Sequence, residues 1–510
     1  MIAKVLSGAL VGIRSRLVDV ETDIAKGMPL FDVVGLPGSS VREARERVRS
    51  AIQNSGFAMP NKRITVNLAP ADMRKEGPAF DLPIAISLLV ASGIVEQASV
   101  DSVFITGELS LDGMIRPVDG VLAMVAELPK MGINRCIVPL DNAYEAAIIE
   151  DLEVVAPRSL VELVEHLCGS LLPPAVPTDI REIADLPSAS PDISDVHGQE
   201  SAKRALEIAA AGGHNMIMVG PPGSGKTMLA RCMLGILPKP SFEEALDTTK
   251  IYSVAGLLQG QTMLTERPFR SPHHSTSYAA LVGGGRTVRP GEISLAHGGV
   301  LFLDELPEFT RSTLEMLRQP MESADITIHR ANSTSVTYPS NFMLLAAMNP
   351  CPCGFYGDGG NRCSCSPLDI SRYLNKISGP LLDRIDIHVE VSAVKFSYLS
   401  TPKSKTSADT SAQVATRVSR ATDIARRRYN QDLRNAHLSP PQIEEYCRLG
   451  ESETNLLRFA FDNMNLSARG YHKILKLART IADLAAEPDI NKTHITEALQ
   501  YRSLDRKYWN

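Results

Sequence analysis

Residues Gly220–Thr227 read GPPGSGKT, and this stretch decides the fold of the chain around it. It fits the pattern G-x-x-x-x-G-K-T, follows the apolar run His214–Val219 (HNMIMV) and precedes the helical sequence MLARCMLGIL, so both flanks argue against a chance glycine-rich loop. Backbone N–H groups in such a loop surround a phosphate, Lys226 adds a cation near the β and γ phosphates, and Thr227 offers its hydroxyl to Mg²⁺. The predicted site for ATP and Mg²⁺ comprises Gly220, Pro221, Pro222, Gly223, Ser224, Gly225, Lys226 and Thr227.

Two further apolar runs, Gly299–Leu303 (GVLFL) and Phe342–Ala347 (FMLLAA), are typical of buried parallel strands. The first leads into Asp304 and Glu305, which predicts that Asp304 holds Mg²⁺ and Glu305 polarises the attacking water. The second leads to Asn349, whose amide can orient water against the γ phosphate. The plainer interpretation of Asp304 and Glu305 is two solvated acids at a strand end. The plainer interpretation of Asn349 is a turn-forming asparagine before a proline.

The composition indicates a globular protein of several domains. A chain of 510 residues corresponds to about three domains at roughly 150 residues each. No stretch approaches the ~18 apolar residues of a transmembrane helix, and no signal peptide is evident, so we expect a cytoplasmic protein without membrane contact. The net charge of −5 argues against binding nucleic acid over the whole surface, so any DNA contact must be local. Four scattered cysteines are expected to be reduced core residues: Cys136, Cys168, Cys232 and Cys447.

Two compositional breaks divide the chain. Leu171–Asp192 is rich in proline and serine, and Ser400–Ser411 is polar with few large apolar residues. The predicted parts are therefore an N-terminal domain (1–170), a linker (171–192), an ATPase core (193–392) and a helical domain (393–510). Five helices with three-to-four apolar spacing are expected in the last part: Gln413–Tyr429, Ser439–Leu449, Glu451–Met464, Ala468–Ala486 and Thr493–Asp505.

Over essentially its whole length the chain resembles the YifB/ComM family of magnesium-chelatase-like AAA+ proteins. The resemblance implies an α/β AAA+ P-loop core with a C-terminal helical lid, preceded by an α+β domain like that of Lon proteases and ribosomal protein S5. It also implies that Val196 and His197 flank the adenine. The stretches that carry the resemblance are KEGPAFDLPIAISLL, DISDVHGQESAKRALEIAAAGGHNMIMVGPPGSGKT, FRSPHHSTSYAALVGGG, RPGEISLAHGGVLFLDELPEF and AAMNPCPCGFYGDGG.

Three residues match catalytic positions of AAA+ proteins. Asn349 matches sensor 1, and Arg469, at the start of a predicted long helix, matches sensor 2. Arg384, in GPLLDRIDIHVEV, matches the arginine that reaches the neighbouring subunit's nucleotide, where a planar permanent cation suits a phosphoryl transition state. The alternatives are an ion pair of Arg384 with Asp383 or Asp386, and a solvated charge at Arg469.

Members of this clade carry an insertion before the Walker B strand and a β-hairpin before sensor 1, and both project toward DNA in related ring helicases. Ala255–His297 is long enough to be the insertion, and Ile326–Pro339 alternates like two strands around a polar turn. Ordinary surface arginines are an equally good interpretation of the basic residues here. The candidates for DNA contact are Arg267, Arg270, Arg286, Arg289, His329 and Arg330.

The resemblance implies a hexameric, ATP-driven helicase for branch migration, used when incoming DNA is integrated in natural transformation. The expected partners are single-stranded and branched DNA and further copies of the chain. The alternative is a chelatase-like ATPase that remodels a protein partner. The additional N-terminal domain and the lack of a chelatase catalytic segment favour DNA.

The first domain resembles the Lon-type fold through Lys75–Asp81 (KEGPAFD) and Gly107–Met124. On that alignment the Ser–Lys dyad falls on Ala79 and Leu122, which offer neither a nucleophilic hydroxyl nor an amine. We therefore expect a non-catalytic domain, with DNA contact or ring assembly as its remaining roles and a surface charge as the plain interpretation of Lys75.

Cys351, Cys353, Cys363 and Cys365 form two C-x-C pairs joined by a glycine-rich loop. Four thiolates this close in sequence can surround Zn²⁺ tetrahedrally, and a reducing cytoplasm disfavours disulfides. Zinc is therefore expected beside Asn349, with four plain reduced cysteines as the alternative.

Overall fold

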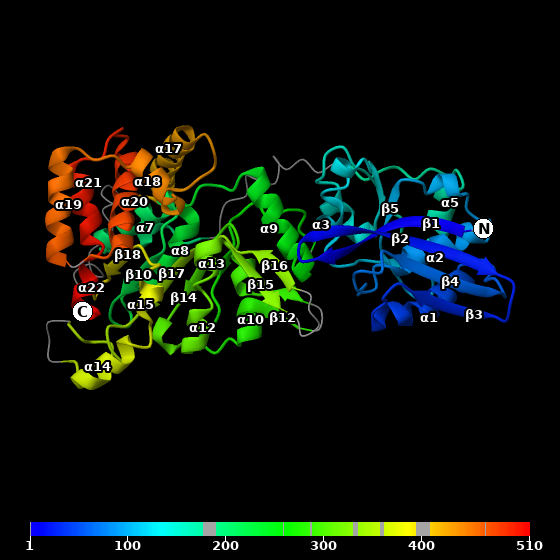
Figure 1. Ribbon diagram of the computed structural model, residues 1–510, viewed down its shortest axis with the longest axis horizontal. Helices are drawn as coiled ribbons and strands as arrows, with labels where there is room; N and C mark the ends of the chain where they lie inside the picture. Colours follow the sequence, from blue (N-terminus) through cyan, green and yellow to red (C-terminus); the bar gives the residue numbers. More distant parts are fainter. Residues whose placement is uncertain are drawn as a thin grey trace.

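The computed structural model describes residues 2–176, 190–258, 260–285, 288–329, 335–357, 362–393, 409–464 and 466–509. The N-terminal domain and the helical domain lie at opposite ends of the long axis, with the ATPase core between them (Figure 1). Within the described residues, no helix is long and apolar enough to span a membrane.

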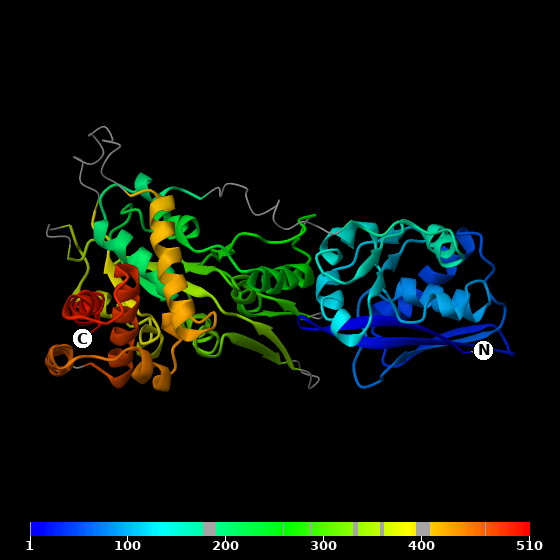
Figure 2. The ribbon, with the colours of Figure 1, turned by 90° about the horizontal axis from the view of Figure 1, so that it is seen from above.

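The N-terminal domain is a mixed seven-stranded sheet in the order β3-β4-β2-β1-β5-β8-β9, and Figure 2 shows helices on one of its faces. Strands β1 and β2 pair antiparallel, and helix α2 packs against both with nearly all of its residues buried. A two-stranded ribbon, β6 with β7, accompanies the sheet. The strands are β1 (Ile2–Val11), β2 (Arg14–Ala25), β3 (Leu30–Val34), β4 (Arg63–Ala69), β5 (Val103–Ile105), β6 (Glu108–Leu109), β7 (Ile115–Arg116), β8 (Arg135–Ile137) and β9 (Glu153–Val155). The helices are α1 (Ser39–Asn54), α2 (Asp81–Ala91), α3 (Val121–Val125), α4 (Ala143–Ala146) and α5 (Leu160–Leu167).

The ATPase core contains a five-stranded parallel sheet in the order β11-β14-β17-β10-β18. Its central strands are entirely buried, which explains why they read as continuous apolar runs. Because the strands are parallel, all their carboxyl ends meet at one edge of the sheet. The strands are β10 (Met216–Val219), β11 (Phe269–Arg270), β14 (Val300–Leu303), β17 (Met343–Met348) and β18 (Ile387–Glu390), and the helices α7 (Glu200–Gly212), α8 (Lys226–Ile236) and α9 (Phe242–Ala255) accompany them.

The predicted hairpin is confirmed: β15 (Asp325–His329) and β16 (Ser335–Pro339) pair antiparallel. Its apolar residues share a hydrophobic cluster with Leu281 and Val282 of the insertion. The insertion contains α10 (Tyr278–Val282), β12 (Gly283–Gly284), β13 (Arg289–Pro290) and α11 (Glu292–Leu295), and α12 (Arg311–Glu315), α13 (Pro320–Ser323), α14 (Pro367–Leu374) and α15 (Gly379–Leu382) follow it in the core.

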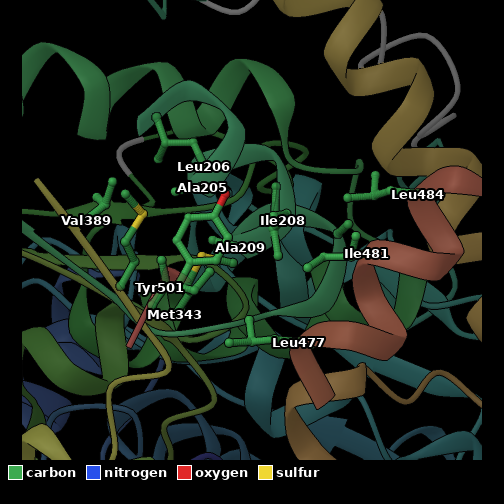
Figure 3. Close-up of a cluster of buried hydrophobic side chains, with 14 of the residues drawn as sticks. Ala205, Leu206, Ile208, Ala209, Met343, Val389, Leu477, Ile481, Leu484 and Tyr501 are labelled. Atoms are coloured by element: carbon green, nitrogen blue, oxygen red, sulfur yellow. The ribbon is translucent and has the colours of Figure 1, made fainter. Parts of the chain in front are cut away.

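The first four helices of the helical domain begin and end within a few residues of the predicted positions. The stretch expected to form one final helix forms two helices instead. It does not have a core of its own, because α20 residues such as Leu477 and Ile481 share one hydrophobic cluster with Leu206 and Ile208 of α7 (Figure 3). The sequence break near residue 400 is therefore not a break in packing. The helices are α17 (Ser411–Tyr429), α18 (Pro440–Tyr446), α19 (Glu451–Met464), α20 (Ala468–Ala485), α21 (Lys492–Gln500) and α22 (Ser503–Tyr508).

The N-terminal domain docks on α9 of the ATPase core. Leu122 of α3 is fully buried in a small cluster with Ala245 of α9 and Met263 of the insertion. Beside this cluster, Ser253 Oγ of α9 lies 2.5 Å from Glu145 Oε2. Burial of the Glu145 carboxyl raises its pKa. The contact joins the two domains through an apolar core with a polar pair next to it.

Two expectations about single residues are wrong. Lys75 is not a surface charge but is fully buried, and its ammonium donates to the carbonyl of Pro70. Burial lowers the pKa of Lys75. Cys168 is exposed, whereas Cys136, Cys232 and Cys447 are buried as expected.

Candidate active site

The phosphate loop connects β10 to α8 at the carboxyl edge of the parallel sheet. Gly225 precedes the first residue of α8 with φ of 91°, a left-handed conformation that glycine adopts without steric cost. The loop lines a pocket of about 380 Å³ together with Asp304, Glu305 and Asn349. The sheet therefore brings the P-loop and three of the predicted catalytic side chains to one place.

Lys226 lies across the P-loop. Its Nζ donates to the carbonyl oxygens of Gly220 at 2.7 Å and Pro221 at 2.8 Å, and it lies 3.2 Å from Oδ1 of Asn349. Burial lowers the pKa of Lys226, and the charges of Asp304 and Glu305 only partly oppose this effect. A buried ammonium held mainly by neutral oxygens has a strong electrostatic preference for an anion such as phosphate.

Thr227, the last residue of the P-loop, lies beside Asp304, the first of the two carboxylates. The Thr227 hydroxyl donates to Asp304 Oδ2 at 2.8 Å, so the two oxygen ligands expected for Mg²⁺ are adjacent. Glu305 follows in a left-handed backbone conformation, with φ of 52° and ψ of 47°. This conformation costs a residue with a side chain about 1 kcal/mol or more, and such strain is concentrated at functional sites.

Arg384 lies between α15 and β18, as the sequence predicts. It pairs with Glu322 at the end of α13 and donates to the Pro380 carbonyl, and neither of the two expected aspartates is its partner. Asp386 instead lies 3.3 Å from Lys473 and 3.2 Å from His214. Burial opposes ionisation of Asp386, but the charge of Lys473 and the hydrogen bond with His214 hold its pKa well below the usual range.

Arg469 is exposed at the start of α20, Val196 is buried in the main hydrophobic cluster, and His197 is half-buried beside it. Among the described residues, neither these three nor Arg384 lines the pocket around the P-loop. Their roles at the adenine, at sensor 2 and across a subunit interface stay predictions.

The four clustered cysteines lie close together, with sulfur atoms within 4.8 Å of one another. Cys351 Sγ is 3.3 Å from Cys353 Sγ and 3.8 Å from Cys363 Sγ. Tetrahedral zinc with Zn–S bonds of about 2.3 Å requires S···S separations of about 3.8 Å, so the geometry fits. A hydrogen bond from the Phe355 backbone lowers the pKa of Cys353 to about 6, whereas the pKa values of Cys363 and Cys365 in the same cluster are raised, so Cys353 is the sulfur that becomes a thiolate first.

This cysteine knuckle, residues 351–365 apart from the undescribed 358–361, lies against the P-loop. An added Cβ at Gly354 would be 2.5 Å from Cδ of Pro222, so only glycine permits this approach. The contact joins the knuckle to the loop that carries the predicted phosphate site.

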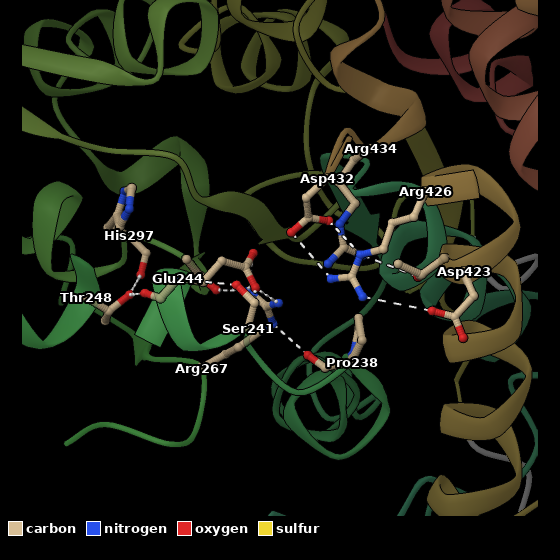
Figure 4. Close-up of polar contacts among 12 residues, drawn as sticks. Pro238, Ser241, Glu244, Thr248, Arg267, His297, Asp423, Arg426, Asp432 and Arg434 are labelled. Carbon is tan, nitrogen blue, oxygen red and sulfur yellow. Dashed lines mark hydrogen bonds and ion pairs between the residues drawn. The ribbon is translucent and has the colours of Figure 1, made fainter. Parts of the chain in front are cut away.

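The candidate DNA-contacting residues fall into three groups. Arg267 has a structural role, because its guanidinium binds Glu244 and the carbonyls of Pro238 and Gly298 (Figure 4), with its side chain only 8% exposed. Arg270 pairs with Glu292 and Arg289 with Asp119 of the N-terminal domain, so both charges are neutralised within the chain. His329 is exposed at the hairpin end. Arg286 and Arg330 lie outside the described residues.

The sequence interpretation missed one contact. His274 Nδ1, in the insertion, lies 3.4 Å from Glu305 Oε2. The stretch FRSPHHSTS was noted only as part of the family resemblance. The sequence offered no signal for this contact, because the two-residue strand β11 that precedes His274 has no periodicity.

Both positions of the Lon-type dyad are apolar and buried, with Ala79 7% and Leu122 0% exposed. Neither offers a nucleophile or a base at that place. A non-catalytic domain therefore remains the prediction. Leu122 packs against the ATPase core instead of serving catalysis.

Family models cover most of the chain. The description "Magnesium chelatase, subunit ChlI" matches residues 192–399, "Subunit ChlI of Mg-chelatase" residues 20–142, and "Magnesium chelatase, subunit ChlI C-terminal" residues 408–502. The competence protein ComM of Haemophilus influenzae is 44% identical over 510 residues, covering 99% of this chain and 98% of that protein. A protein named YifB from Escherichia coli is 45% identical, covering 98% and 96%. The 67 kDa magnesium-chelatase subunit of Chlorobaculum parvum is 29% identical over 163 residues, 31% of this chain and 23% of that subunit.

Proposed function

This chain belongs to the YifB/ComM family of magnesium-chelatase-like AAA+ ATPases, and from that membership we propose that it is an ATP-hydrolysing ring motor that acts on DNA. The proposed form is a hexameric helicase that promotes branch migration of recombination intermediates during natural transformation. The observation that carries the proposal is that Lys226, Thr227, Asp304, Glu305 and Asn349 line one pocket at the carboxyl edge of the parallel sheet. The full-length similarity to a protein named for competence supports the DNA substrate.

The residues of the pocket divide the proposed ATPase reaction between them. Lys226 exchanges its carbonyl partners for the β and γ phosphates, and the P-loop N–H groups bind the remaining oxygens. Thr227 and Asp304 would hold Mg²⁺, which would neutralise charge at the phosphates. Glu305 orients and polarises the attacking water, and Asn349 fixes that water against the γ phosphate.

Three further roles are part of the proposal. Arg384 leaves Glu322 and reaches the nucleotide of the neighbouring subunit, Arg469 contacts the nucleotide when the helical domain acts as a lid, and Val196 with His197 flanks the adenine. The four cysteines of the knuckle would hold Zn²⁺, which would stiffen the segment after Asn349, where Gly354 contacts Pro222.

DNA contact is assigned to the hairpin rather than to the arginines of the insertion. Arg267, Arg270 and Arg289 have carboxylate partners within the chain, so each would have to break an ion pair to bind phosphate. His329 is exposed at the end of β15, and Arg330 is the next residue in the sequence. The positive charge of Arg330 suits a protein whose net charge of −5 disfavours broad DNA binding.

The test compares ATP hydrolysis without DNA, with single-stranded DNA and with branched DNA. We expect DNA to stimulate hydrolysis, and three- or four-way junctions to move only when ATP is hydrolysed. Joint substitution His329→Ala and Arg330→Ala should keep basal hydrolysis near normal while abolishing stimulation and junction movement. Lys492→Ala, which removes an exposed cation on α21, is the matched control.

A hairpin variant that moves junctions at the wild-type rate would exclude the hairpin from the mechanism. Absence of DNA stimulation in the wild type would favour the alternative, an ATPase that remodels a protein partner. The partial similarity to a magnesium-chelatase subunit is the observation that supports this alternative.

A further inference from the structure

Arg384 lies at the opposite edge of the parallel sheet from the P-loop. Strand β18 pairs in parallel with β10, and Ile387 lies opposite Met216, the first residue of β10. The P-loop follows Val219, the last residue of the same strand, whereas Arg384 comes three residues before Ile387. Because the strand rises roughly 3.3 Å per residue, about 10 Å of sheet separates the two places. This placement suits a contact with another chain's nucleotide, which requires the backbone of Arg384 to be held at a defined position.

The ATPase core holds this backbone from one side. Asn215 Nδ2 donates to the carbonyl of Arg384 at 3.1 Å, and the backbone N–H of Asp386 donates to the Asn215 carbonyl at 2.9 Å. Arg502, beyond α21, donates from Nη1 to the carbonyl of Ile385 at 2.9 Å. The peptide that follows Arg384 is therefore attached to the strand β10 side of the core and to the C-terminal segment.

The helical domain holds the same peptide through Lys473 of α20. Its Nζ donates to the Ile385 carbonyl at 2.9 Å and lies 3.3 Å from Asp386 Oδ1, with the side chain only 13% exposed. Burial lowers the pKa of Lys473 to about 8, and the charge of Asp386 opposes this effect, so the ammonium stays charged at neutral pH. His214 lies 3.2 Å from the other carboxylate oxygen of Asp386 and 2.8 Å from Thr480 Oγ1 of α20. Helix α20 therefore meets this peptide once directly and once through an imidazole.

We propose that Lys473 is a positioning residue for Arg384. Its ammonium holds the Ile385 carbonyl and the Asp386 carboxylate, and so fixes the place from which Arg384 reaches the nucleotide of the neighbouring subunit. The inference rests on the proposed role of Arg384 across that interface. Without Lys473 the peptide keeps its contacts with the core but is free to shift on the side of the helical domain. A shift of about 1 Å at a group that contacts the reacting phosphate is enough to lower a rate up to about 100-fold.

Lys476 is a matched control on the same helix. Its Nζ donates to the Ala436 carbonyl at 2.8 Å, within the helical domain. Burial lowers the pKa of Lys476 as it lowers that of Lys473. Both lysines bring a buried ammonium to a backbone carbonyl, but that of Lys473 lies next to Arg384 in the chain. A general cost of removing a buried lysine from α20 should therefore appear in both variants.

The experiment is a double-mutant cycle on the full-length protein, with kcat and KM for ATP hydrolysis as the readouts. Lys473→Met should lower kcat about fivefold to 50-fold and leave KM within about twofold of the wild type, because the chain's own nucleotide pocket is unchanged. In the Arg384→Ala background the same substitution should lower kcat less than about twofold, because a positioning residue has no effect once the group that it positions is absent. Lys473→Arg, which keeps a charged donor, should stay within about threefold of the wild-type kcat. Lys476→Met should leave kcat within about twofold.

An equal loss of kcat from Lys473→Met in both backgrounds would reveal a general structural effect and overturn the inference. An unchanged kcat in the wild-type background, or an equally large loss in Lys476→Met, would also overturn it. If Lys473→Met does not fold, Lys473→Gln takes its place in the cycle with the same expected and overturning results, since its amide can still donate but carries no charge. Arg384→Ala alone tests the proposed function: a wild-type kcat in that variant would contradict the reach of Arg384 across the interface, and the inference about Lys473 would fall with it. A loss in Arg384→Ala combined with equal losses in the two backgrounds contradicts only the inference, so the two failures are distinguishable.

Discussion

At the scale of single residues, the pocket separates the binding of phosphate from the activation of water. Lys226 is buried within the P-loop and donates to the loop's carbonyls, whereas the Glu305 side chain is exposed and lies against His274. The two side chains therefore affect different steps, and their substitutions should have different kinetic signatures.

Lys226→Ala should weaken ATP binding at least about tenfold, because a charge-assisted contact to phosphate is lost. Glu305→Gln should keep ATP affinity and lose about 100-fold or more in kcat, because the amide cannot polarise water. Binding of a fluorescent ATP analogue and single-turnover hydrolysis separate the two effects. Glu308→Gln, a neighbouring carboxylate outside the pocket lining, should retain both activities; comparable turnover in Glu305→Gln and the wild type would exclude Glu305 as the base.

The residues of the P-loop were predictable because their roles are local: backbone conformation, a following helix and a charge at a fixed spacing. Arg267 and His274 were not, because their partners are set by strand pairing. Nothing in the sequence near Arg267 indicates that Glu244, 23 residues earlier, lies against it at 2.7 Å. Whether an arginine is free to bind DNA depends on such partners. Counting arginines in the sequence therefore overestimates the number that can bind DNA.

At the scale of elements, apolar periodicity predicted the buried strands and the helices of the helical domain well. It could not predict β11, since two residues carry no period, nor the break between α21 and α22 at Tyr501 and Arg502. Arg502 donates to the Ile385 carbonyl, a long-range contact that anchors the chain at that break.

The cysteine knuckle gives a prediction about metal content. Purified protein should hold about one Zn²⁺ per chain, and joint Cys351→Ser and Cys363→Ser substitution should remove it, because two thiolates cannot complete a tetrahedral site. Because Gly354 contacts Pro222, loss of zinc should also weaken ATP binding. Elemental analysis of protein prepared without chelator checks the stoichiometry.

Cys168→Ser, which changes an exposed free cysteine outside the knuckle, should retain the zinc and the ATP affinity of the wild type. Metal-free wild-type protein, or full zinc in the double variant, would leave four reduced loop cysteines as the correct interpretation.

At the scale of the whole molecule, the proposed ring predicts that one defective subunit affects its neighbours. Arg384→Ala should bind ATP normally and inhibit wild-type subunits on mixing. If every subunit of a six-membered ring is needed, an equal random mixture leaves only about 2% of rings fully wild type. ATP hydrolysis across a series of mixing ratios measures the effect.

A loss of activity in simple proportion to the variant's share would contradict the placement of Arg384 at a neighbour's nucleotide. Glu322→Gln, which removes the partner of Arg384 within its own chain, is the matched control and should leave mixed rings active.

The burial of Leu122 beneath α9 constrains how this domain can evolve. On the Lon-type alignment, Ala79→Ser with Leu122→Lys would restore the residue types of a peptidase but not its chemistry. The new ammonium would lie in an apolar contact, where desolvation would neutralise it or force α9 away. A lysine at position 122 therefore requires the N-terminal domain and α9 to separate first.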